Sequence, residues 1–320
     1  MVNSVLVTGA TGFVGRALCA QLLASGDEVI GVGRSVAKPS SLSGVAWHCL
    51  DLEAGDFKQA ISGNVDCIVH LAGQAHGKGG SESQTLDGFR RINVDASLRL
   101  AREAIEAGVR RFVFVSSIGV HGTGTNGAAI SERTPFNPCS PYALSKLEAE
   151  QELTRLFEAA HSSELTIVRP PLVYGADAPG NFGSLLKLAN SPVPLPFGMC
   201  SNRRNMVSLT GLVDFLVACT HHPGAGGQSF VVADTSAVST KDIVASLRTG
   251  MGRAKRLVPL PPPVMAGALG VLGKRDMYNQ LFCDLEVDNQ KARKLVGWVP
   301  CENTVGELER IGKHYVDSCS

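Results

Sequence analysis

The sequence predicts an α/β protein built on a doubly wound parallel sheet, with a smaller lobe in its C-terminal part. Three observations predict it. Short β-branched runs alternate with segments of helical periodicity through the first half, a glycine-rich loop directly follows the first of these runs, and the composition shifts to glycine, proline and asparagine after residue 175. We therefore expect one α/β domain over residues 1–175, to which residues 207–234 return, and a second lobe over residues 176–320.

Six apolar runs in the first half have the length and the β-branched content of buried parallel strands. Three helices are expected between them, over Gly15–Ser25, Leu86–Ala107 and Pro141–Ala160, and the last has an apolar face at helical spacing. A helix over Leu209–Thr220 and a strand over Gln228–Asp234 are expected to return to the sheet. The six strands begin at Ser4, Glu28, Val45, Asp66, Arg111 and Leu165.

The composition excludes several functional classes. Basic and acidic side chains nearly balance in the 320 residues, with a net charge of +1, so no nucleic acid or other polyanionic partner is expected. The nine cysteines form no CxxC pair and no cluster with histidine, which predicts a reducing compartment and no metal site. The apolar run Val264–Gly273 has about half the length of a membrane span. We expect a cytoplasmic protein without membrane insertion.

The stretch "TGATGFVG" places Gly9, Gly12 and Gly15 after the first strand and at the start of a helix. Glycines there allow a tight turn and let backbone N–H groups approach a pyrophosphate, whose charge the helix N-terminus stabilises. We therefore expect a dinucleotide cofactor on this loop. The other residues expected at the contact are Thr11, Phe13 and Val14.

The end of the second strand predicts which dinucleotide binds. An acidic residue at this place accepts hydrogen bonds from the adenosine ribose of NAD and repels the 2′-phosphate of NADP. Here the run ends in Gly33, and Arg34 follows. A guanidinium suits a phosphate, so NADP(H) is favoured. A plain surface role for Arg34 and the use of NAD(H) both stay open.

The stretch "SPYALSK" places Tyr142 and Lys146 one helical turn apart, on a helix that Ser140 caps and Pro141 begins. Free tyrosine has a pKa of about 10, too high for efficient proton exchange at neutral pH. The ammonium of Lys146 is expected to favour the phenolate, which lowers the pKa of Tyr142, and to hydrogen bond the nicotinamide ribose. The pair predicts a proton-transfer centre for hydride transfer at a carbonyl group.

These stretches occur together with "CLDL", "HLAG", "INVDAS", "VSSIGVHG" and "RPPLVYG", in an order that resembles the extended short-chain dehydrogenase/reductase superfamily and its NAD-dependent epimerase/dehydratase family. The resemblance covers nearly the whole chain. It implies a Rossmann fold and a catalytic set of Ser117, Tyr142 and Lys146. If the alignment is shifted by one residue, Ser116 takes the place of Ser117 as the catalytic serine. Otherwise Ser116 is expected to contact the cofactor. The remaining cofactor contacts that it implies are Asp51, Leu52, Leu71, Ala72, Gly73, Asn93, Pro170 and Val173.

The residues after Ser117 separate the branches of this family. Nucleotide-sugar dehydratases carry an Asp-Glu pair there and 3,5-epimerases carry a cysteine, whereas this chain has Ile118 and Gly119. His121 replaces the family's usual tyrosine and is expected to be structural. A 4-keto reductase and a 4-epimerase both stay open, and the NADP-type pocket favours the reductase. A non-catalytic NADP-binding sensor is a remote alternative.

The C-terminal half resembles reductases that convert UDP-4-keto-6-deoxy-GlcNAc to UDP-QuiNAc for lipopolysaccharide O-antigen and other surface polysaccharides. The resemblance therefore implies a UDP-sugar substrate. Arg204 occupies the place of an arginine that grips the diphosphate, with Arg203 as the neighbouring candidate. Arg275 is similar to a second phosphate arginine, and Asn181 to an asparagine on the nucleotide side. A homodimer built from the second and third predicted helices is also implied.

Overall fold

Seven parallel strands form one sheet in the computed structural model. The structure describes residues 3–53, 55–61, 64–75, 85–125, 127–271, 273 and 275–318, without the side chains of residues 268, 275 and 276. The sheet order turns back between β1 and β4, at the switch point where doubly wound sheets bind ligands, and the predicted fold class is confirmed. Along the sheet the strands are β3 (Ala46–Cys49), β2 (Glu28–Gly33), β1 (Ser4–Thr8), β4 (Cys67–His70), β5 (Arg111–Val115), β6 (Glu164–Arg169) and β9 (Ser229–Val231).

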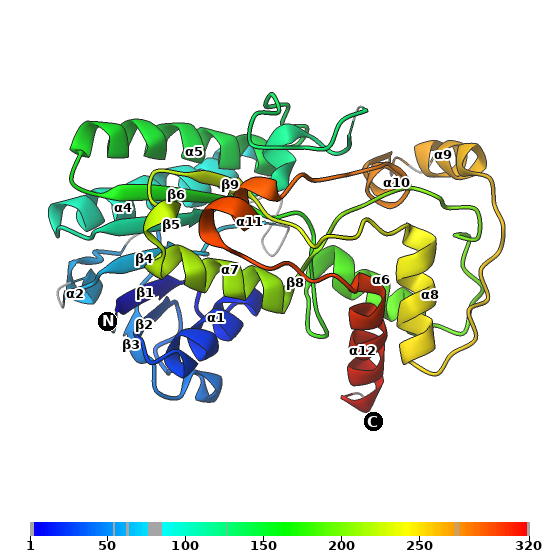
Figure 1. Ribbon diagram of the computed structural model, residues 1–320, viewed down its shortest axis with the longest axis horizontal. Helices are drawn as coiled ribbons and strands as arrows, with labels where there is room; N and C mark the ends of the chain where they lie inside the picture. The colour runs from blue at the N-terminus through cyan, green and yellow to red at the C-terminus, as the bar shows by residue number, and fades with distance from the viewer. Residues whose placement is uncertain are drawn as a thin grey trace.

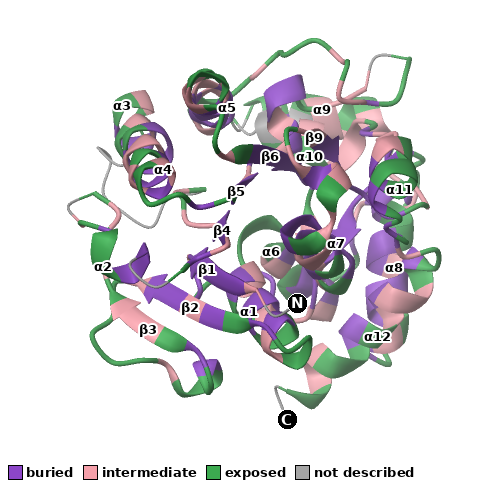
Figure 2. Cartoon of the chain, turned by 60° about the vertical axis from the view of Figure 1, so that its left-hand side comes forward, coloured by how far each residue is buried: buried purple, intermediate pink, exposed green. Residues whose placement is uncertain are grey.

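Helices cover both faces of this sheet (Figure 1, Figure 2). One face carries α1 (Phe13–Ala24), α7 (Leu209–His221) and α11 (Gln290–Val296). The other carries α2 (Lys58–Ile61), α3 (Leu86–Arg90), α4 (Ala96–Glu106) and α5 (Pro141–Ala160). Val5 and Val7 pack toward α1 and α7, whereas Leu6 packs toward α4 and α5. Successive strand side chains point to opposite faces, so burial of both faces requires an unbroken apolar run in the middle of β1.

A π-helical turn interrupts the helix that the sequence predicts over Leu86–Ala107. The turn spans Arg91–Asp95, between α3 and α4, and Asn93 is its central residue. Hydrogen bonds from residue i to residue i+5 are rare in proteins, and such turns inside α-helices are frequent at functional sites. The chain is thus helical over the predicted segment as far as Glu106, and the π-helical turn lies where a site residue is expected.

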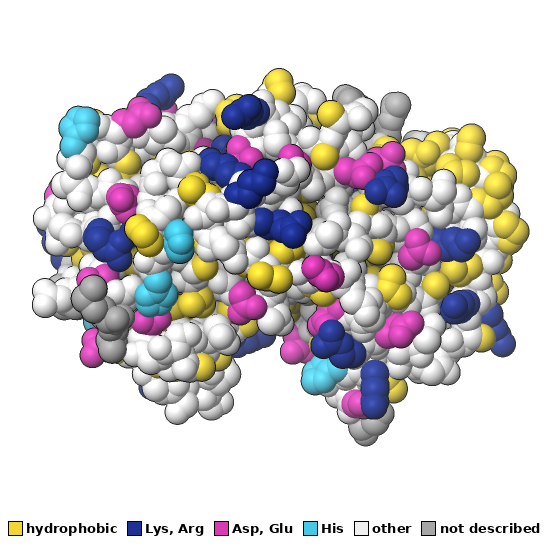
Figure 3. Space-filling model, in the orientation of Figure 1, with side chains coloured by type: hydrophobic (Ala, Val, Ile, Leu, Met, Phe, Trp, Pro, Cys, Tyr) yellow, Lys and Arg dark blue, Asp and Glu magenta, His cyan; other side chains and the backbone are white. Residues whose placement is uncertain are grey.

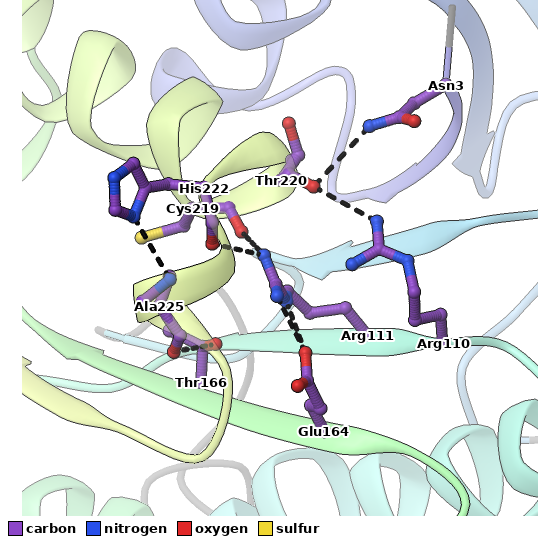
Figure 4. Close-up of polar contacts among 10 residues, drawn as sticks. Asn3, Arg110, Arg111, Glu164, Thr166, Cys219, Thr220, His222 and Ala225 are labelled. Carbon is purple, nitrogen blue, oxygen red and sulfur yellow. Dashed lines mark hydrogen bonds and ion pairs between the residues drawn. The ribbon is translucent and has the colours of Figure 1, made fainter. Parts of the chain in front are cut away.

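Arg111, the first residue of β5, ties the C-terminal end of α7 to the sheet (Figure 4). Its Nη1 atom donates to the carbonyl oxygens of Cys219 (2.9 Å) and His222 (2.8 Å). Its Nη2 atom donates to Oε2 of Glu164 (2.6 Å). The Arg111 side chain is 1% exposed. A buried cation at this end of a helix satisfies carbonyl groups that lack intrahelical partners and offsets the negative end of the helix dipole.

A second group of helices follows β7 (Val173–Tyr174) and lies to one side of the sheet in Figure 1. It contains α6 (Gly180–Asn190), α8 (Thr240–Gly250), α9 (Pro262–Val271), α10 (Arg275–Phe282) and α12 (Thr304–Asp317). Phe182, Leu247 and Leu308 belong to its core. The chain does not stay in this group, because β7 pairs with β8 (Val207–Ser208) and the chain then runs through α7 to β9.

α11 also packs on the sheet side, with Ala292 and Val296 in the core beneath α1 and α7. The division at residue 175 therefore stays a proposal. Within the described residues, no helix is long and apolar enough to cross a bilayer. The eight cysteines among them are free thiols.

Candidate active site

The glycine loop between β1 and α1 forms a cradle for an anion. Gly9 has a φ of +69°, and a side chain there would meet the backbone nitrogen of Ala72 at 2.9 Å. A side chain at Gly15 would overlap the carbonyl oxygen of Gly9. Gly12 is the N-cap residue of α1 without a side-chain cap, and the first turn holds no acidic residue. The N–H groups of that turn are therefore available to a pyrophosphate.

The other three residues predicted at this loop have different surroundings. Thr11 is exposed, close to Gly33 at the end of β2. The half-buried ring of Phe13 packs against Gly175, where an added Cβ would lie 2.8 Å from its Cζ atom. Val14 packs against the core beneath α7. Phe13 and Val14 thus offer backbone groups rather than side chains to a cofactor.

The indole of Trp47 covers the end of β2. A side chain at Gly33 would stand 2.5 Å from Cη2 of Trp47, so this position has no room for the acidic residue that contacts the ribose of NAD. Nε1 of Trp47 donates to the carbonyl oxygen of Ser35 (2.9 Å), which fixes the ring. The side chain of Arg34 is exposed beside this strand end. The structure thus supplies the physical reason for glycine at residue 33.

The predicted contacts near the adenine lie on the loops after β3 and β4. Asp51 is exposed, and its Oδ1 atom accepts a hydrogen bond from the backbone nitrogen of Glu53 (2.9 Å). Leu52 is half-buried against the α4 side of the sheet, and Leu71 against the α1 side. Parallel strands end at one edge, so both loops border the same crevice as the glycine loop.

A buried chain of hydrogen bonds connects the end of β1 to the π-helical turn. The Thr8 hydroxyl accepts from the backbone nitrogen of Ala72 (3.2 Å) and donates to Nδ1 of His70 (2.6 Å). Nε2 of His70 donates to Oγ of Ser97 (2.8 Å), and Ser97 donates to the carbonyl oxygen of Asn93 (2.8 Å). Burial lowers the pKa of His70 to about 3, which keeps the ring neutral, as this order of donors requires. Sequence analysis missed Thr8 and Ser97.

Gly73 lies where three elements meet. A side chain at this position would stand 3.0 Å from Oδ1 of Asn93 and 3.3 Å from Nζ of Lys146. Asn93 accepts from the backbone nitrogen of Gln74 (2.9 Å) and donates to Oγ of Ser145 (3.0 Å) on α5. The loop after β4, the π-helical turn and α5 are therefore fixed to one another around Lys146.

Tyr142, in the first turn of α5, is hydrogen bonded to the side chain of Ser117. Ser117 follows β5, and its Oγ atom accepts from the backbone nitrogen of Gly119 (3.1 Å). Burial raises the pKa of Tyr142 to about 12, and the hydrogen bond with Ser117 opposes this rise. The expectation of a lowered tyrosine pKa is therefore wrong for this structure. Tyr142 is a protonated group that can donate.

The position of Lys146 explains why the pKa of Tyr142 is raised and not lowered. Its Nζ atom donates to the carbonyl oxygen of Val115 (2.9 Å) and lies 4.6 Å from the centre of the Phe114 ring. The ammonium is thus directed toward β5, and its charge does not offset the burial of Tyr142. Burial also lowers the pKa of Lys146 to about 8, while the charge of Glu150 opposes this fall. A lysine with such a pKa changes its charge near neutral pH, which is typical of functional sites.

A buried ion pair lies one helical turn beyond Lys146. Arg169, at the end of β6, donates from Nε to Oε1 (3.0 Å) and from Nη2 to Oε2 (2.6 Å) of Glu150. Its Nη1 atom faces Nε2 of His121 at 3.2 Å, and the His121 ring stacks on Phe136. Burial and the charge of Arg169 lower the pKa of His121, so the ring is a neutral acceptor. Sequence analysis missed Glu150 and Arg169, because their pairing joins residues on two different elements.

Ser116, a predicted cofactor contact, lies directly after β5. Oγ of Ser116 is buried and has no hydrogen-bond partner in the described part of the chain. Ile118 packs into a small core, and its N–H donates to the carbonyl oxygen of Pro170 (2.9 Å). Val173 pairs with Val207 across β7 and β8. An unpaired buried hydroxyl is costly, so Ser116 fits a polar group of a ligand.

Two predicted substrate contacts, Asn181 and Arg204, both meet α10. Nδ2 of Asn181 donates to Oε1 of Gln280 (2.9 Å). Nη1 of Arg204 donates to the carbonyl oxygens of Asn279 (3.2 Å) and Cys283 (2.6 Å) at the end of that helix. Burial lowers the pKa of Arg204. One edge of its guanidinium is thus held by the end of α10.

The two alternative arginines differ from Arg204. Arg203 is exposed, and its Nε atom pairs with Oε2 of Glu286 (3.0 Å). This surface pair makes Arg203 the weaker candidate for a diphosphate, because its guanidinium already has an anionic partner. The side chain of Arg275, the first residue of α10, lies outside the described residues.

The model of the "NAD dependent epimerase/dehydratase family" matches residues 5–233. The chain belongs to this family. A UDP-glucose 4-epimerase of Vibrio cholerae is 36% identical to this member of the family, over 94% of the chain and 92% of the relative. A ceramide reductase of Caulobacter vibrioides is 31% identical, over 83% of the chain and 76% of the relative. The structure of MoeE5 in complex with UDP-glucose and NAD has a TM-score of 0.80 at 25% identity, over 99% of this chain and 100% of that chain.

This member of the NAD dependent epimerase/dehydratase family is an enzyme, and its residues fit a nicotinamide dinucleotide. The glycine cradle would be filled by any Cβ at Gly9 or Gly15, and the N–H groups of α1 suit the pyrophosphate. The buried hydroxyl of Ser116, which has no partner among the described residues, would be satisfied by a polar group of such a cofactor. These features and the Ser117–Tyr142 hydrogen bond border one edge of the sheet.

Proposed function

We propose that the protein is a 4-keto reductase that converts UDP-4-keto-6-deoxy-GlcNAc to UDP-QuiNAc with NADPH. The observation that carries this proposal is the end of β2, where Trp47 excludes an acidic side chain at residue 33 and Arg34 is exposed. This arrangement suits a 2′-phosphate. A reductase exchanges its cofactor in every turnover and can use NADPH from solution, whereas an epimerase recycles one bound NAD.

Tyr142 is the proton donor in this mechanism. NADPH, when bound on the glycine loop, would supply the hydride for C4 of the sugar. Tyr142 donates its proton to the C4 carbonyl oxygen, which becomes a hydroxyl, so one ketone and one proton are consumed with each hydride. Ser117, already hydrogen bonded to Tyr142, holds that oxygen in line. The pKa of Tyr142, raised to about 12, keeps the resting tyrosine protonated, which supports the reductive direction.

The residue after Ser117 limits the chemistry that can follow. Ile118 is buried in a core with Ile130, Val231 and Leu285. It therefore provides neither the carboxylate that water elimination needs nor a thiol for proton removal at C3 or C5. In the proposed complex, Arg204 and Asn181 bind the UDP part of the substrate in the lobe over residues 176–320. We include in the proposal a homodimer through α4 and α5 and a role in cytoplasmic synthesis of surface polysaccharides.

A UDP-sugar 4-epimerase is the second candidate, and the similarity to a relative named as a UDP-glucose 4-epimerase favours it. In that reaction Tyr142 first accepts the proton of the C4 hydroxyl while C4 loses a hydride to bound NAD, and Tyr142 later returns the proton to the C4 oxygen when the hydride is given back to the opposite face of the ketone. The tyrosine must therefore ionise before the first hydride transfer. A non-catalytic sensor is disfavoured because Ser117, Tyr142 and Lys146 occur together.

One experiment separates these functions. The purified protein is incubated with UDP-4-keto-6-deoxy-GlcNAc and NADPH or NADH, and separately with UDP-glucose or UDP-GlcNAc without added cofactor. We expect loss of NADPH absorbance in a one-to-one ratio with UDP-QuiNAc, and a smaller rate with NADH. Inversion at C4 without net use of cofactor would contradict the reductase and identify the epimerase. Cofactor binding without turnover of any nucleotide sugar would identify the sensor.

A further inference from the structure

Helix α9 exposes apolar side chains at the surface of the second lobe. No charged residue occurs between residues 257 and 273, which include this helix and its approach. Val264 is 53% exposed and Val271 is 90% exposed. Among the described side chains of α9, Leu269 is the buried one. A helix that packs only against its own protein buries its apolar side chains and exposes polar ones.

The apolar surface continues beyond α9. The segment before α9 is held against residues 193–199 by backbone hydrogen bonds, from Val258 to Leu195 (2.8 Å) and from Gly198 to Val258 (2.9 Å). Hydrophobic side chains gather at this end of the molecule in Figure 3. We call this surface the α9 patch, and its exposed large apolar residues are Val193, Met199, Val258, Val264, Val271 and Met277. Single exposed apolar residues are common, but a group of this kind marks a contact surface.

Basic side chains accompany the α9 patch. Residues 243–275 contain no acidic residue. Arg253, Lys255 and Arg256 are exposed on the loop that leads from α8 to α9, and Val258 of the patch comes two residues after Arg256. In the sequence, Lys274 and Arg275 follow α9 at its other end. The combination of apolar and cationic groups is typical of surfaces that bind anionic membranes.

We propose that the α9 patch is a docking surface for an anionic lipid bilayer. The apolar side chains enter the boundary between headgroups and acyl chains, and the exposed basic residues of the preceding loop contact acidic headgroups. This is peripheral contact, because a helix of ten residues cannot span a bilayer. A second copy of the chain fits less well, since a two-fold contact through this patch would bring the basic loops of both copies together.

Vesicle flotation tests the proposal without any substrate, so its outcome is independent of the proposed reaction. The full chain is mixed with vesicles of phosphatidylcholine alone or with one quarter phosphatidylglycerol. We expect binding to the anionic vesicles, weakened by salt, and little binding to the neutral ones. The double variant Val264→Gln/Val271→Gln should bind roughly tenfold more weakly because the inserted apolar area is lost. Lys255→Gln/Arg256→Gln should bind more weakly by about fivefold per charge.

The matched controls lie outside the patch. Val299→Gln replaces a valine that is 76% exposed, and Lys241→Gln/Lys313→Gln removes two exposed charges. Both should bind vesicles like the wild type, with unchanged circular dichroism in all variants. Absence of binding to anionic vesicles, or equal losses in patch and control variants, overturns the proposal. If Val264→Gln/Val271→Gln instead lowers the mass measured by light scattering, the patch covers a second copy and the proposal is wrong.

Discussion

Glu150 and Arg169 form a buried ion pair with two hydrogen-bonded contacts, one helical turn beyond Lys146. The carboxylate lies between two cations, one of which belongs to the proposed proton-transfer centre. Its charge raises the pKa of Lys146, against the effect of burial. Arg169 holds Glu150 in this position from β6, so the electrostatics of the catalytic helix depend on a neighbouring strand.

The first prediction concerns the pH dependence of turnover. If the charged form of Lys146 is required, kcat is high below a pKa of about 8 and falls as the pH rises through it. Glu150→Gln removes the charge that raises this pKa, so the alkaline limb of kcat should move to lower pH. Glu150→Asp keeps the charge and should restore the limb.

The control for this prediction is Glu148→Gln on the same helix. Glu148 pairs with Arg90 (2.6 Å) at a more exposed place. We expect kcat of Glu148→Gln to fall at the same alkaline pH as kcat of the wild type. If kcat of folded Glu150→Gln also falls at the wild-type pH, the role of the Glu150 carboxylate is refuted.

The second prediction concerns Tyr142. In Tyr142→Phe the protonated donor is lost while the ring stays, so kcat should fall by about 10²–10⁴. Cofactor affinity, measured by fluorescence titration, should stay within about twofold of the wild type. The substitution removes the proton donor used in the reaction and is not expected to weaken binding of the cofactor. Tyr315→Phe, in α12, is the control. Near-normal turnover of Tyr142→Phe would disprove the mechanism.

The third prediction concerns cofactor choice. Arg34→Gln removes the guanidinium proposed to contact the 2′-phosphate, so KM for NADPH should rise by roughly tenfold while KM for NADH changes little. Initial rates with both cofactors provide the measurement. Arg133→Gln removes another exposed arginine and should alter neither value. Equal changes for the two cofactors in Arg34→Gln would rule out a 2′-phosphate contact.

The fourth prediction concerns stability. Arg111→Met leaves the carbonyl oxygens of Cys219 and His222 without their donors, so the free energy of unfolding should fall by on the order of 3 kcal/mol. Urea denaturation followed by circular dichroism measures it. Arg110→Met removes an exposed neighbour with a long contact to Thr220 (3.5 Å), and we expect a loss of less than about 1 kcal/mol. Equal losses in the two variants would contradict the role assigned to Arg111.

Features that depend on local chemistry could be predicted from the amino-acid sequence. α5 begins at Pro141 and ends at Ala160, as predicted, because Ser140 accepts from the backbone nitrogen of Ala143 (3.2 Å) and proline suits the first helical position. The glycine loop could also be predicted. A side chain at Gly9 or Gly15 would overlap backbone atoms of the loop itself or of the segment after β4. The positions of the strands could be predicted from unbroken apolar runs, because strands that are buried on both faces carry apolar side chains on both.

The effect of distant residues on these local features could not be predicted, because it depends on how the elements pack. The packing directs Nζ of Lys146 to the carbonyl oxygen of Val115 and half-buries Tyr142, so the pKa of the tyrosine is raised where a lowered pKa is expected from the sequence. It also placed Trp47 over Gly33 and left α9 exposed. The physical reason is that burial, long-range hydrogen bonds and solvent exposure depend on which elements pack together. Helix capping and hydrophobic periodicity involve residues close in the sequence. In contrast, the pKa of a group and the exposure of a docking surface depend on all the elements that pack around them.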